Sequence, residues 1–433
     1  MKNNQNKSKV QKLIQEEIKR QKEELQLIPS ENYTSSSVRY ALGSPLTHKY
    51  SEGQVGSRYY EGNEVIDKIE NLCKKEALKL FGLTEKWHVN VQAYSGSIAN
   101  LAVLNALLKP NDKIMAMYLF EGGHLSHGWK YKDKKITLSS KIYNVAFYHV
   151  DNKTEVFDYD AIKKLAQKEK PNIIISGGTA YPREIDHNKL SQIAKTTGAY
   201  YLADIAHEAG LVAGGVNKSP FPYADVVTMT THKTLRGPRG ALIFCKKDRA
   251  EEIDRSVFPG IQGGPFNNNI AAIAVCLMEA QTKVFKKYAH QIIKNTKQLE
   301  AEFKKYNYKL ISGGTEKHLL LINLASKNIN GKYAARALRI AGITLNKNTV
   351  PNEQGSPFDP SGIRLGTPAV SSRGMQETEM KKIAGLINDV IEISKKYSSL
   401  EFEEFQKKIH SNHMIHEIRN KVTKLCNQFP LPK

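Results

Sequence analysis

An alternation of short apolar strands and amphipathic helices between about residues 67 and 230 most constrains what this chain can fold into. Strands are expected at 89–92, 113–117, 143–150, 172–176 and 199–203, and at Val226-Val227. Helices are expected at 69–80, 98–108, 160–168 and 188–197, the last ending at Gly198. Such alternation predicts an α/β domain with a mainly parallel sheet covered by helices. In a sheet of this kind the functional loops follow the carboxyl ends of the strands.

A different pattern follows residue 264 and predicts a smaller α+β domain. A helix at 270–280 leads into a long basic helix at 284–305, which we interpret as the hinge. The expected elements beyond it are strands at 308–311 and 318–324, a helix at 333–341, the strand-like segment 362–368, and two terminal helices at 375–395 and 401–426. We therefore expect an N-terminal helical arm (1–30), a large domain (31–283) and a small C-terminal domain (284–433).

Charge is the unusual feature of the composition. The chain has 64 Lys and Arg residues against 43 Asp and Glu residues, a net charge of +21. Along 284–305, however, the lysines alternate with acidic residues, as on a solvated helix face. No zinc-finger, RNA-recognition or basic-region motif accompanies the charge, so nucleic acid is not the expected partner.

The cellular setting is expected to be the cytoplasm. The four cysteines are widely spaced with no CxxC pair, which is typical of reduced structural thiols. No segment approaches the roughly 20 apolar residues of a membrane helix, and the N-terminal region has no apolar core of the kind that a secretory signal contains. The expected N-terminal helix is amphipathic and needs a partner surface. We expect no membrane and no metal at the site.

Lys233 stands where a buried strand gives way to a turn. The preceding residues include Thr228, Thr230 and His232, and the turn Arg236-Gly237-Pro238-Arg239-Gly240 follows. Burial and neighbouring cations lower the pKa of a lysine amine, which lets the amine attack a carbonyl and form a Schiff base. In a chain with so many lysines, a solvated surface lysine is the simplest alternative.

A second strand end favours the functional interpretation. The strand at 199–203 leads directly into Asp204, and His207 follows three residues later. A pyridoxal phosphate enzyme needs a carboxylate that keeps the pyridine nitrogen protonated, so that the ring can accept electrons. Upstream, Ser95-Gly96-Ser97 opens an apolar helix and could cradle a phosphate with backbone donors, although the local sequence alone favours simple N-capping.

Long ungapped motifs join these features to a known family. THKTLRGPRG (231–240), LADIAHEAGL (202–211) and FPGIQGGP (258–265) resemble serine hydroxymethyltransferase, a pyridoxal phosphate enzyme of fold type I. The resemblance extends from about Glu24 into the C-terminal helices. It implies reversible transfer of the serine hydroxymethyl group to tetrahydrofolate, giving glycine and 5,10-methylenetetrahydrofolate. It also implies a homodimer with shared active sites, or a tetramer.

The resemblance assigns roles to individual residues. Lys233 would carry the cofactor covalently, Asp204 would pair with its ring nitrogen, and His124 would stack on the ring. Further cofactor contacts are implied for Ser95, Gly96, Ser97, Thr179, His207, Tyr50 and Gly263. Thr230 and His232 would shape the pocket, and Glu52 would be the acid or base at the hydroxymethyl group with Tyr60 beside it. In the family, Tyr50, Glu52 and Gly263 act in the site of the partner subunit.

Substrate and folate residues are implied in the same way. Arg364 is the candidate for the substrate carboxylate, because a guanidinium offers two parallel donors; a solvent-facing strand position is the alternative. Ser30 would lie beside the substrate. The implied folate contacts are Leu119, Gly123, His124, Leu125, Asn346, Ser356, Pro357 and Phe358.

Some positions depart from the family pattern, and other functions stay open. Ala93, Gln54-Val55, Phe266 and Glu208 are unusual, which puts the kinetics and folate preference in question rather than the class. The main rival enzyme is a tetrahydrofolate-independent aldolase acting on threonine-like substrates, against which Glu52 and the folate segments argue. A basic nucleic-acid binder with an inactive enzyme fold would show steeply salt-dependent RNA binding. A purely structural dimer would leave Lys233, Asp204 and Arg364 unexplained.

Overall fold

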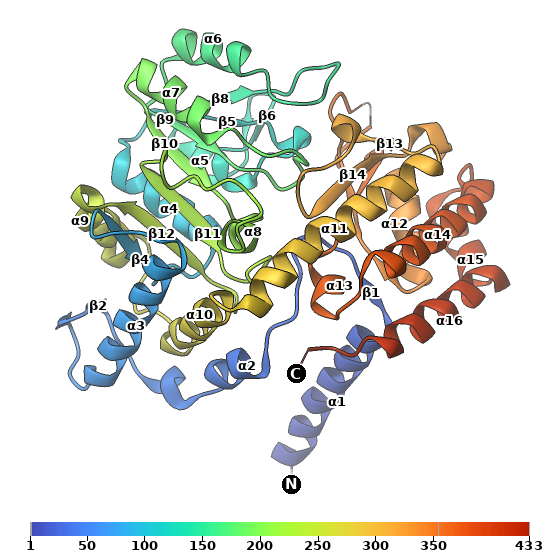
Figure 1. Ribbon diagram of the computed structural model, residues 1–433, viewed down its shortest axis with the longest axis horizontal. Helices are drawn as coiled ribbons and strands as arrows, with labels where there is room; N and C mark the ends of the chain where they lie inside the picture. The colour runs from blue at the N-terminus through green and yellow to red at the C-terminus, as the bar shows by residue number, and fades with distance from the viewer. Residues whose placement is uncertain (1, 354, 433) are drawn as a thin grey trace. The chain divides into compact units, whose positions relative to one another are not determined.

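The computed structural model describes residues 2–353 and 355–432, with side chains described from residue 8 onward. The chain forms two compact units, Thr34–Ile293 and the combination of Met1–Tyr33 with Lys294–Lys433. Both chain ends thus belong to one unit; Figure 1 shows the chain coloured from blue at the N-terminus to red at the C-terminus. The boundary falls inside one long helix, α11 (Lys283–Lys305). The expected division into arm, large domain and small domain stays a prediction.

The Thr34–Ile293 unit is built on a seven-stranded sheet with the order β4-β12-β11-β10-β9-β5-β8. Its strands are β4 (Trp87–Asn90), β5 (Lys113–Met117), β8 (Asn144–Tyr148), β9 (Ile173–Ser176), β10 (Tyr200–Asp204), β11 (Val226–Thr230) and β12 (Ala241–Lys246). All neighbouring pairs among β8, β5, β9, β10 and β11 are parallel, whereas β12 pairs antiparallel with β11 and β4. The mainly parallel sheet is confirmed, and β12 is a strand that the sequence analysis did not identify.

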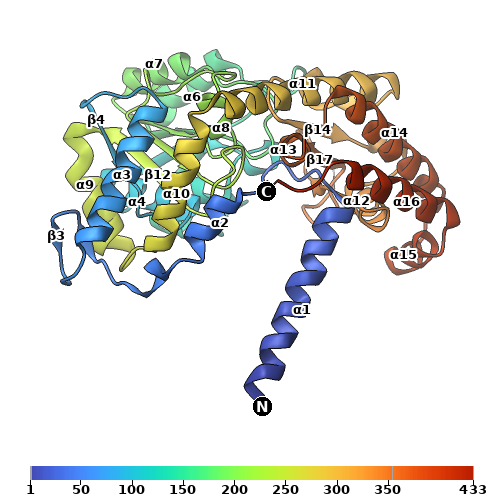
Figure 2. The same ribbon diagram turned by 60° about the horizontal axis from the view of Figure 1, so that its bottom comes forward.

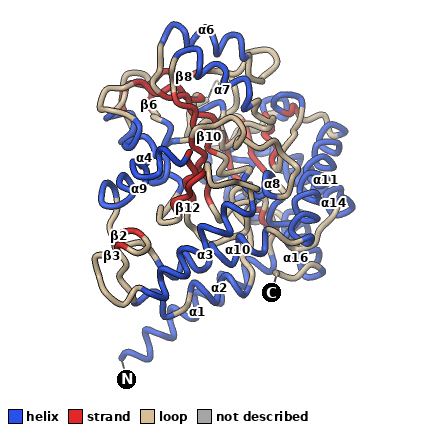
Figure 3. Tube along the Cα trace, turned by 60° about the vertical axis from the view of Figure 1, so that its left-hand side comes forward, coloured by secondary structure: helices blue, strands red, loops and turns tan. Residues whose placement is uncertain are grey.

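Helices cover both faces of this sheet, and Figure 3 shows the strands enclosed by them. One face packs against α4 (Gly96–Leu107) and α9 (Ala250–Arg255), and the other against α3 (Glu64–Leu80), α6 (Tyr159–Glu169), α7 (His187–Thr197), α8 (Ala209–Ala213) and α10 (Asn267–Ala280). Along β9, Ile173 and Ile175 enter one core and Ile174 enters the other. A strand buried on both faces must be apolar throughout, which explains the unbroken isoleucine run.

Local signals set several of these boundaries. Ser95 caps α4 by accepting a hydrogen bond from the backbone N–H of Ile98, and Asp186 caps α7 through Lys189. Gly198 ends α7 in the left-handed conformation with φ 69°, where glycine carries no steric cost. These caps agree with the helix ends that the sequence predicts.

The second unit contains an antiparallel sheet of order β13-β14-β17-β16. Its strands are β13 (Lys309–Leu310), β14 (Leu319–Asn323), β17 (Gly362–Gly366) and β16 (Asn346–Asn348). It packs in one core with α12 (Gly331–Ile340), α14 (Glu377–Ser394), α15 (Phe402–His410) and α16 (His413–Gln428). In this unit β1 (Leu25–Gln26) pairs in parallel with β15 (Ile343–Thr344), so the N-terminal segment is part of the core.

The expected terminal helix at 401–426 is wrong as a single helix. The structure has α15 ending at His410 and α16 beginning at His413. Asn412 accepts a hydrogen bond from the backbone N–H of Ile415, which starts α16 afresh. The N-terminal helix α1 (Lys2–Glu23) contacts α16, and Figure 2 shows it leading away from α16 toward the N-terminus. Val10, Leu13 and Ile14 on α1 are exposed.

Candidate active site

Lys233 lies in a buried turn directly after β11, and its side chain is 8% exposed. Two threonines tie this turn to the turn after β10. Thr230 donates to the carbonyl of Ala206 at 3.1 Å, and Thr234 donates to the carbonyl of His207 at 3.0 Å. Because the two strand ends are fixed to each other in this way, Lys233 and the Asp204–His207 segment form one buried cluster.

The Lys233 turn is also held from the helix side. Arg236 adopts φ 65°, a left-handed conformation that costs energy for a residue with a side chain. Its guanidinium lies 4.3 Å from the ring centre of Tyr288, and the hydroxyl of Tyr288 donates to the carbonyl of Thr234. Tyr288 on α11 thus contacts both the side chain of Arg236 and the backbone of the turn that carries Lys233.

Asp204 ends β10 with its carboxylate buried and hydrogen-bonded on both oxygens. Oδ2 accepts from His127 Nε2 at 2.9 Å and from Asn100 Nδ2 at 2.7 Å, while Oδ1 accepts from the backbone N–H of Ala206. Burial alone raises the pKa of Asp204, but the hydrogen bond from His127 and the neighbouring imidazoles lower it well below its usual range. Asp204 is therefore ionised at neutral pH.

His124 belongs to the same cluster and is neutral. Burial and the nearby His127 lower the pKa of His124 to about 4. The imidazoles of His124 and His127 and the Asp204 carboxylate each place an atom within 4.8 Å of the others. Such a set could bind a metal ion, but the Asp204 oxygens already accept three hydrogen bonds, which we take as their role.

Other predicted residues gather at the same strand ends. Thr179 follows β9 and donates to the carbonyl of Gly123 at 3.0 Å, which holds the His124 loop in place. A Cβ on Gly96 would lie 2.7 Å from Thr230 Cγ2, so the turn that opens α4 comes as close to β11 as only a glycine allows.

The two histidines beside Lys233 and Asp204 are also buried or shielded. His207 is 5% exposed. Burial and the charges of Lys233 and Arg239 lower the pKa of His232 to about 3.

Tyr50, Glu52 and Gly263 form a second group in the same unit. A Cβ on Gly263 would lie 3.4 Å from Glu52 Oε1, and Tyr50 packs against Gly264 and edge-on against Tyr60 at 5.5 Å. The tyrosine rings face outward, with Tyr50 60% and Tyr60 42% exposed. This group shares an exposed face, in contrast to the buried cluster around Lys233.

The backbone of the 49–60 loop is held by hydrogen bonds although its tyrosine side chains are exposed. Asn267 donates to the carbonyl of Lys49 and Asn63 to that of Tyr50. Arg58 donates to the carbonyls of Ser51 and Gly53, the two neighbours of Glu52. The Arg58 guanidinium also pairs with Asp67 and with the fully buried Glu70, each at 2.7 Å. Glu52 is thus presented by a rigid loop.

In the other unit, Arg364 lies at the middle of β17 between β14 and β16. Its Nε donates to Asn346 Oδ1 at 3.0 Å, so a predicted substrate residue and a predicted folate residue touch. Burial lowers the pKa of Arg364 to about 10, which leaves it cationic at neutral pH. Ser30 is half-buried, and Phe358 is 79% exposed in a turn where Ser356 accepts from the backbone N–H of Asp359.

The departures from the family pattern have local explanations in two cases. Phe266 stacks on Tyr94 at 4.5 Å, beside the turn that opens α4. Glu208 is buried near Tyr201, whose hydroxyl contacts His187 and Ser176. Burial raises the pKa of Tyr201, and the Glu208 carboxylate adds to that rise. Nothing in the structure explains Ala93 or Val55.

Asn100 and His127 are site residues that the sequence analysis missed. Both touch Asp204 directly and are 1% exposed. The sequence offered one signal for each: Asn100 is a polar residue inside the apolar helix 98–108, and His127 is a second histidine three residues after His124.

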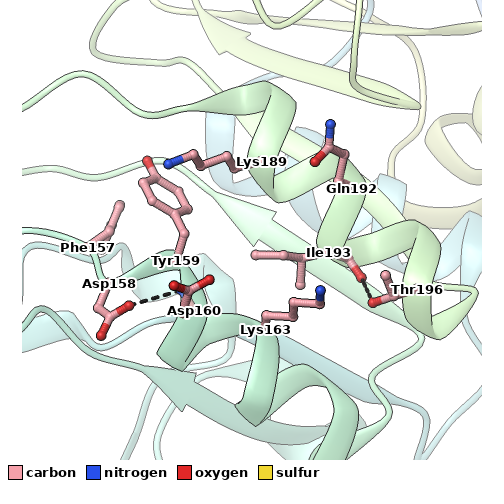
Figure 4. Close-up of a pocket in the computed structure, with 9 residues that line it drawn as sticks. All are labelled: Phe157, Asp158, Tyr159, Asp160, Lys163, Lys189, Gln192, Ile193 and Thr196. Atoms are coloured by element: carbon pink, nitrogen blue, oxygen red, sulfur yellow. Dashed lines mark hydrogen bonds between the residues drawn. The ribbon is translucent and has the colours of Figure 1, made fainter.

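A separate hollow lies between α6 and α7 (Figure 4), with a volume of about 480 Å³. Its lining residues are Phe157, Asp158, Tyr159, Asp160, Lys163, Lys189, Gln192, Ile193 and Thr196. None of the residues predicted for the site lines it. No helix among the described residues has the length and apolar character needed to cross a membrane.

The chain also matches known proteins over most of its length. A family model described as serine hydroxymethyltransferase matches residues 3–387. The chain belongs to this family. A curated relative, the serine hydroxymethyltransferase of Desulfotalea psychrophila, is 49% identical over 420 residues, which cover 97% of this chain and 93% of the relative.

Proposed function

We propose that this enzyme transfers the hydroxymethyl group of serine reversibly to tetrahydrofolate, with pyridoxal phosphate held covalently by Lys233. Membership of the family supports a pyridoxal phosphate-dependent one-carbon transferase that interconverts serine and glycine. The observation that carries the proposal is the single buried cluster formed by the Lys233 turn and the Asp204–His207 turn.

The residues present fit this cofactor. A buried, ionised Asp204 is the partner that a protonated pyridine nitrogen requires, and the close approach of Gly96 to Thr230 leaves a glycine-lined turn at a helix start suited to a phosphate. When bound, the cofactor supplies an electron sink that stabilises negative charge at the substrate Cα. Ser95, Gly96, Ser97 and Thr179 would complete the cofactor contacts.

The chain's own residues would bind substrate and move protons. Arg364 and Ser30 would hold the amino-acid carboxylate, since a cationic guanidinium offers paired donors. Glu52 would take or give the proton at the hydroxymethyl oxygen, and Tyr60 would order that end of the substrate. Burial and the charge of Lys233 lower the pKa of His232, so this imidazole is neutral at pH 7. It can therefore accept a proton or a hydrogen bond near the lysine amine.

We further propose that tetrahydrofolate contacts Leu119, Gly123, Leu125, Asn346 and the 356–358 turn. Asn346 contacts Arg364, so folate and substrate would meet at neighbouring side chains of one sheet. We also propose a homodimer in which Tyr50, Glu52 and Gly263 serve the partner's site. Their exposed face and rigid backbone support that assignment.

The test is the visible spectrum of the purified protein, recorded alone, with glycine, and with glycine plus tetrahydrofolate. We expect a cofactor band in the resting enzyme and a new longer-wavelength band when folate joins glycine. Lys233→Ala should lose the covalent cofactor and lower folate-dependent turnover by about 10³-fold or more. A visible absorption band that does not change when tetrahydrofolate is added would favour the folate-independent aldolase. Normal turnover by Lys233→Ala would refute the proposal.

A further inference from the structure

Asn100, on α4, contacts three groups of the buried cluster through one side-chain amide. Nδ2 donates to Asp204 Oδ2 at 2.7 Å and to Ser126 Oγ at 2.9 Å, while Oδ1 accepts from Thr228 Oγ1 at 2.7 Å. Both amide protons and the carbonyl oxygen are therefore used. The reversed amide would place its oxygen against the Asp204 carboxylate, which is repulsive. The amide orientation is fixed by its neighbours.

Ser126 extends these contacts to His124. Its hydroxyl oxygen accepts from Asn100 and lies 2.7 Å from His124 Nδ1, so its proton is free to be donated to that nitrogen. The backbone N–H of Ser126 points at the same Nδ1 at 3.2 Å. A ring nitrogen that accepts hydrogen bonds must carry no proton. The single proton of the neutral imidazole is then on Nε2.

We propose that Asn100 and Ser126 form a positioning relay that holds His124 as the neutral Nε2–H tautomer while it orients the Asp204 carboxylate. The titratable groups facing His124 are His127, Asp204 and Lys233, and burial is the largest influence on the pKa of His124. The two site residues that flank the predicted cofactor ring are thus set by one buried amide.

The consequence for catalysis rests on the proposed function. A cationic imidazole above a protonated pyridine would place like charges face to face, whereas a neutral imidazole stacks without that penalty. A defined tautomer also fixes which edge of the imidazole donates a hydrogen bond. Neither Asn100 nor Ser126 needs to touch the reacting atoms for this role.

The chain offers a matched control on the same helix. Asn105, five positions after Asn100 on α4, donates to Ser256 Oγ at 2.9 Å, and Ser256 donates to the carbonyl of Ala102. Ser256 is buried, at 5% exposed, whereas Asn105 itself is exposed. This Asn–Ser pair has no histidine at its end. Ser256→Ala reports the cost of losing a buried serine without touching the relay.

The test is nitrogen-15 NMR of histidine-labelled enzyme loaded with pyridoxal phosphate, with His124 assigned by its loss in His124→Gln. We expect an unprotonated Nδ1 and a protonated Nε2 between about pH 6 and pH 8. Ser126→Ala should populate the Nδ1–H tautomer and weaken retention of pyridoxal phosphate by about five- to thirty-fold, the effect of one lost hydrogen bond. Ser126→Thr keeps the hydroxyl and should restore both properties, and Ser256→Ala should change neither.

A proton on Nδ1 in the unaltered enzyme, or a cationic His124 at neutral pH, would overturn the proposal. So would a Ser126→Ala enzyme whose tautomer and cofactor retention match the unaltered protein. The proposed function fails separately: the spectrum of unaltered enzyme would then lack the Lys233-dependent cofactor band, and the His124 tautomer would still be measurable in the cofactor-free protein.

Discussion

The buried cluster around Asp204 and the 49–60 loop lie in the same unit but are built in opposite ways. At Asp204 the functional side chains themselves are buried and hydrogen-bonded to each other. In the 49–60 loop it is the backbone that is held, while Tyr50, Tyr59 and Tyr60 are 60%, 80% and 42% exposed. The first arrangement pre-organises side chains within one chain, whereas the second leaves side chains exposed on the surface, as the proposed shared site would require.

The largest effect is expected at the buried cluster. Asp204→Asn keeps the shape of the side chain but removes its negative charge. Turnover should fall by about 10²- to 10³-fold, because removing one partner of a buried charge pair costs about 3–4 kcal/mol. Steady-state kinetics with saturating pyridoxal phosphate would measure the loss.

Asp254 supplies the control for this variant. It accepts from His88 at 2.9 Å and Asn90 at 2.7 Å on one oxygen, the same donor types that Asp204 has. Asp254→Asn should leave turnover unchanged. Equal losses in both variants would mean that Asp204 matters only for folding.

The pH dependence of stability gives a second contrast. The pKa of Asp204 is lower in the folded protein than in the unfolded chain, where it is about 3.9. The ionised carboxylate therefore stabilises the fold at pH values above about 3.9. This stabilisation is lost as the pH falls toward the pKa of the folded state. Asp204→Asn should therefore flatten the acid limb of a stability–pH curve measured by urea unfolding of the cofactor-free protein. A curve that keeps its slope below about pH 4 would contradict the assignment.

The backbone clamp of the 49–60 loop should show a smaller effect. Arg58→Lys keeps the charge, but a lysine amine cannot reach all four partners of the Arg58 guanidinium at once. We therefore expect the free energy of unfolding to fall by about 1–3 kcal/mol. We also expect kcat to fall while the absorbance of the bound cofactor is retained. Arg255→Lys, in an exposed pair with Glu251, should do neither. Loss of the cofactor band in Arg58→Lys would show that the loop and the cluster are not separable.

The smallest effect is expected at an exposed ring. Tyr59→Ala should leave the unfolding of the monomer unchanged and weaken dimerisation by about 1–2 kcal/mol, or about five- to thirty-fold, because an aromatic ring lost from an interface costs that much. Sedimentation over a concentration series would measure it, with Tyr223→Ala as the control tyrosine. An unchanged dimer would place the 49–60 loop outside the interface.

Much of the fold follows from the sequence because periodicity reports burial. The apolar run of β9 reports that both faces of the sheet are covered. Gly198 marks the end of α7, because the residue after the helix adopts the left-handed conformation that glycine reaches at no steric cost. The break between α15 and α16 was missed because the apolar pattern continues across Ser411-Asn412, although Asn412 is a cap residue. β12 was missed because it follows the Gly-rich turn, where we expected loop.

The site was predictable only where chemistry leaves a motif. Lys233 and Asp204 stand in long ordered motifs, and the structure brings their strand ends together. Asn100 and His127 are unusual where they stand, but neither position indicates a contact with Asp204, which comes from the packing of α4 and the His124 loop against β10. Pairing of this kind depends on tertiary structure, which sequence spacing does not encode.

We proposed that each active site combines the Lys233 cluster of one subunit with the 49–60 loop of another, and mixed dimers test this central proposal most directly. Lys233→Ala and Glu52→Gln should each be nearly inactive alone. After equal mixing with subunit exchange, half of the dimers carry one variant of each kind, and each such dimer has one intact site if the loop is shared. The account predicts recovery of about a quarter of unaltered activity. No recovery, with exchange verified by a tagged subunit, would contradict it.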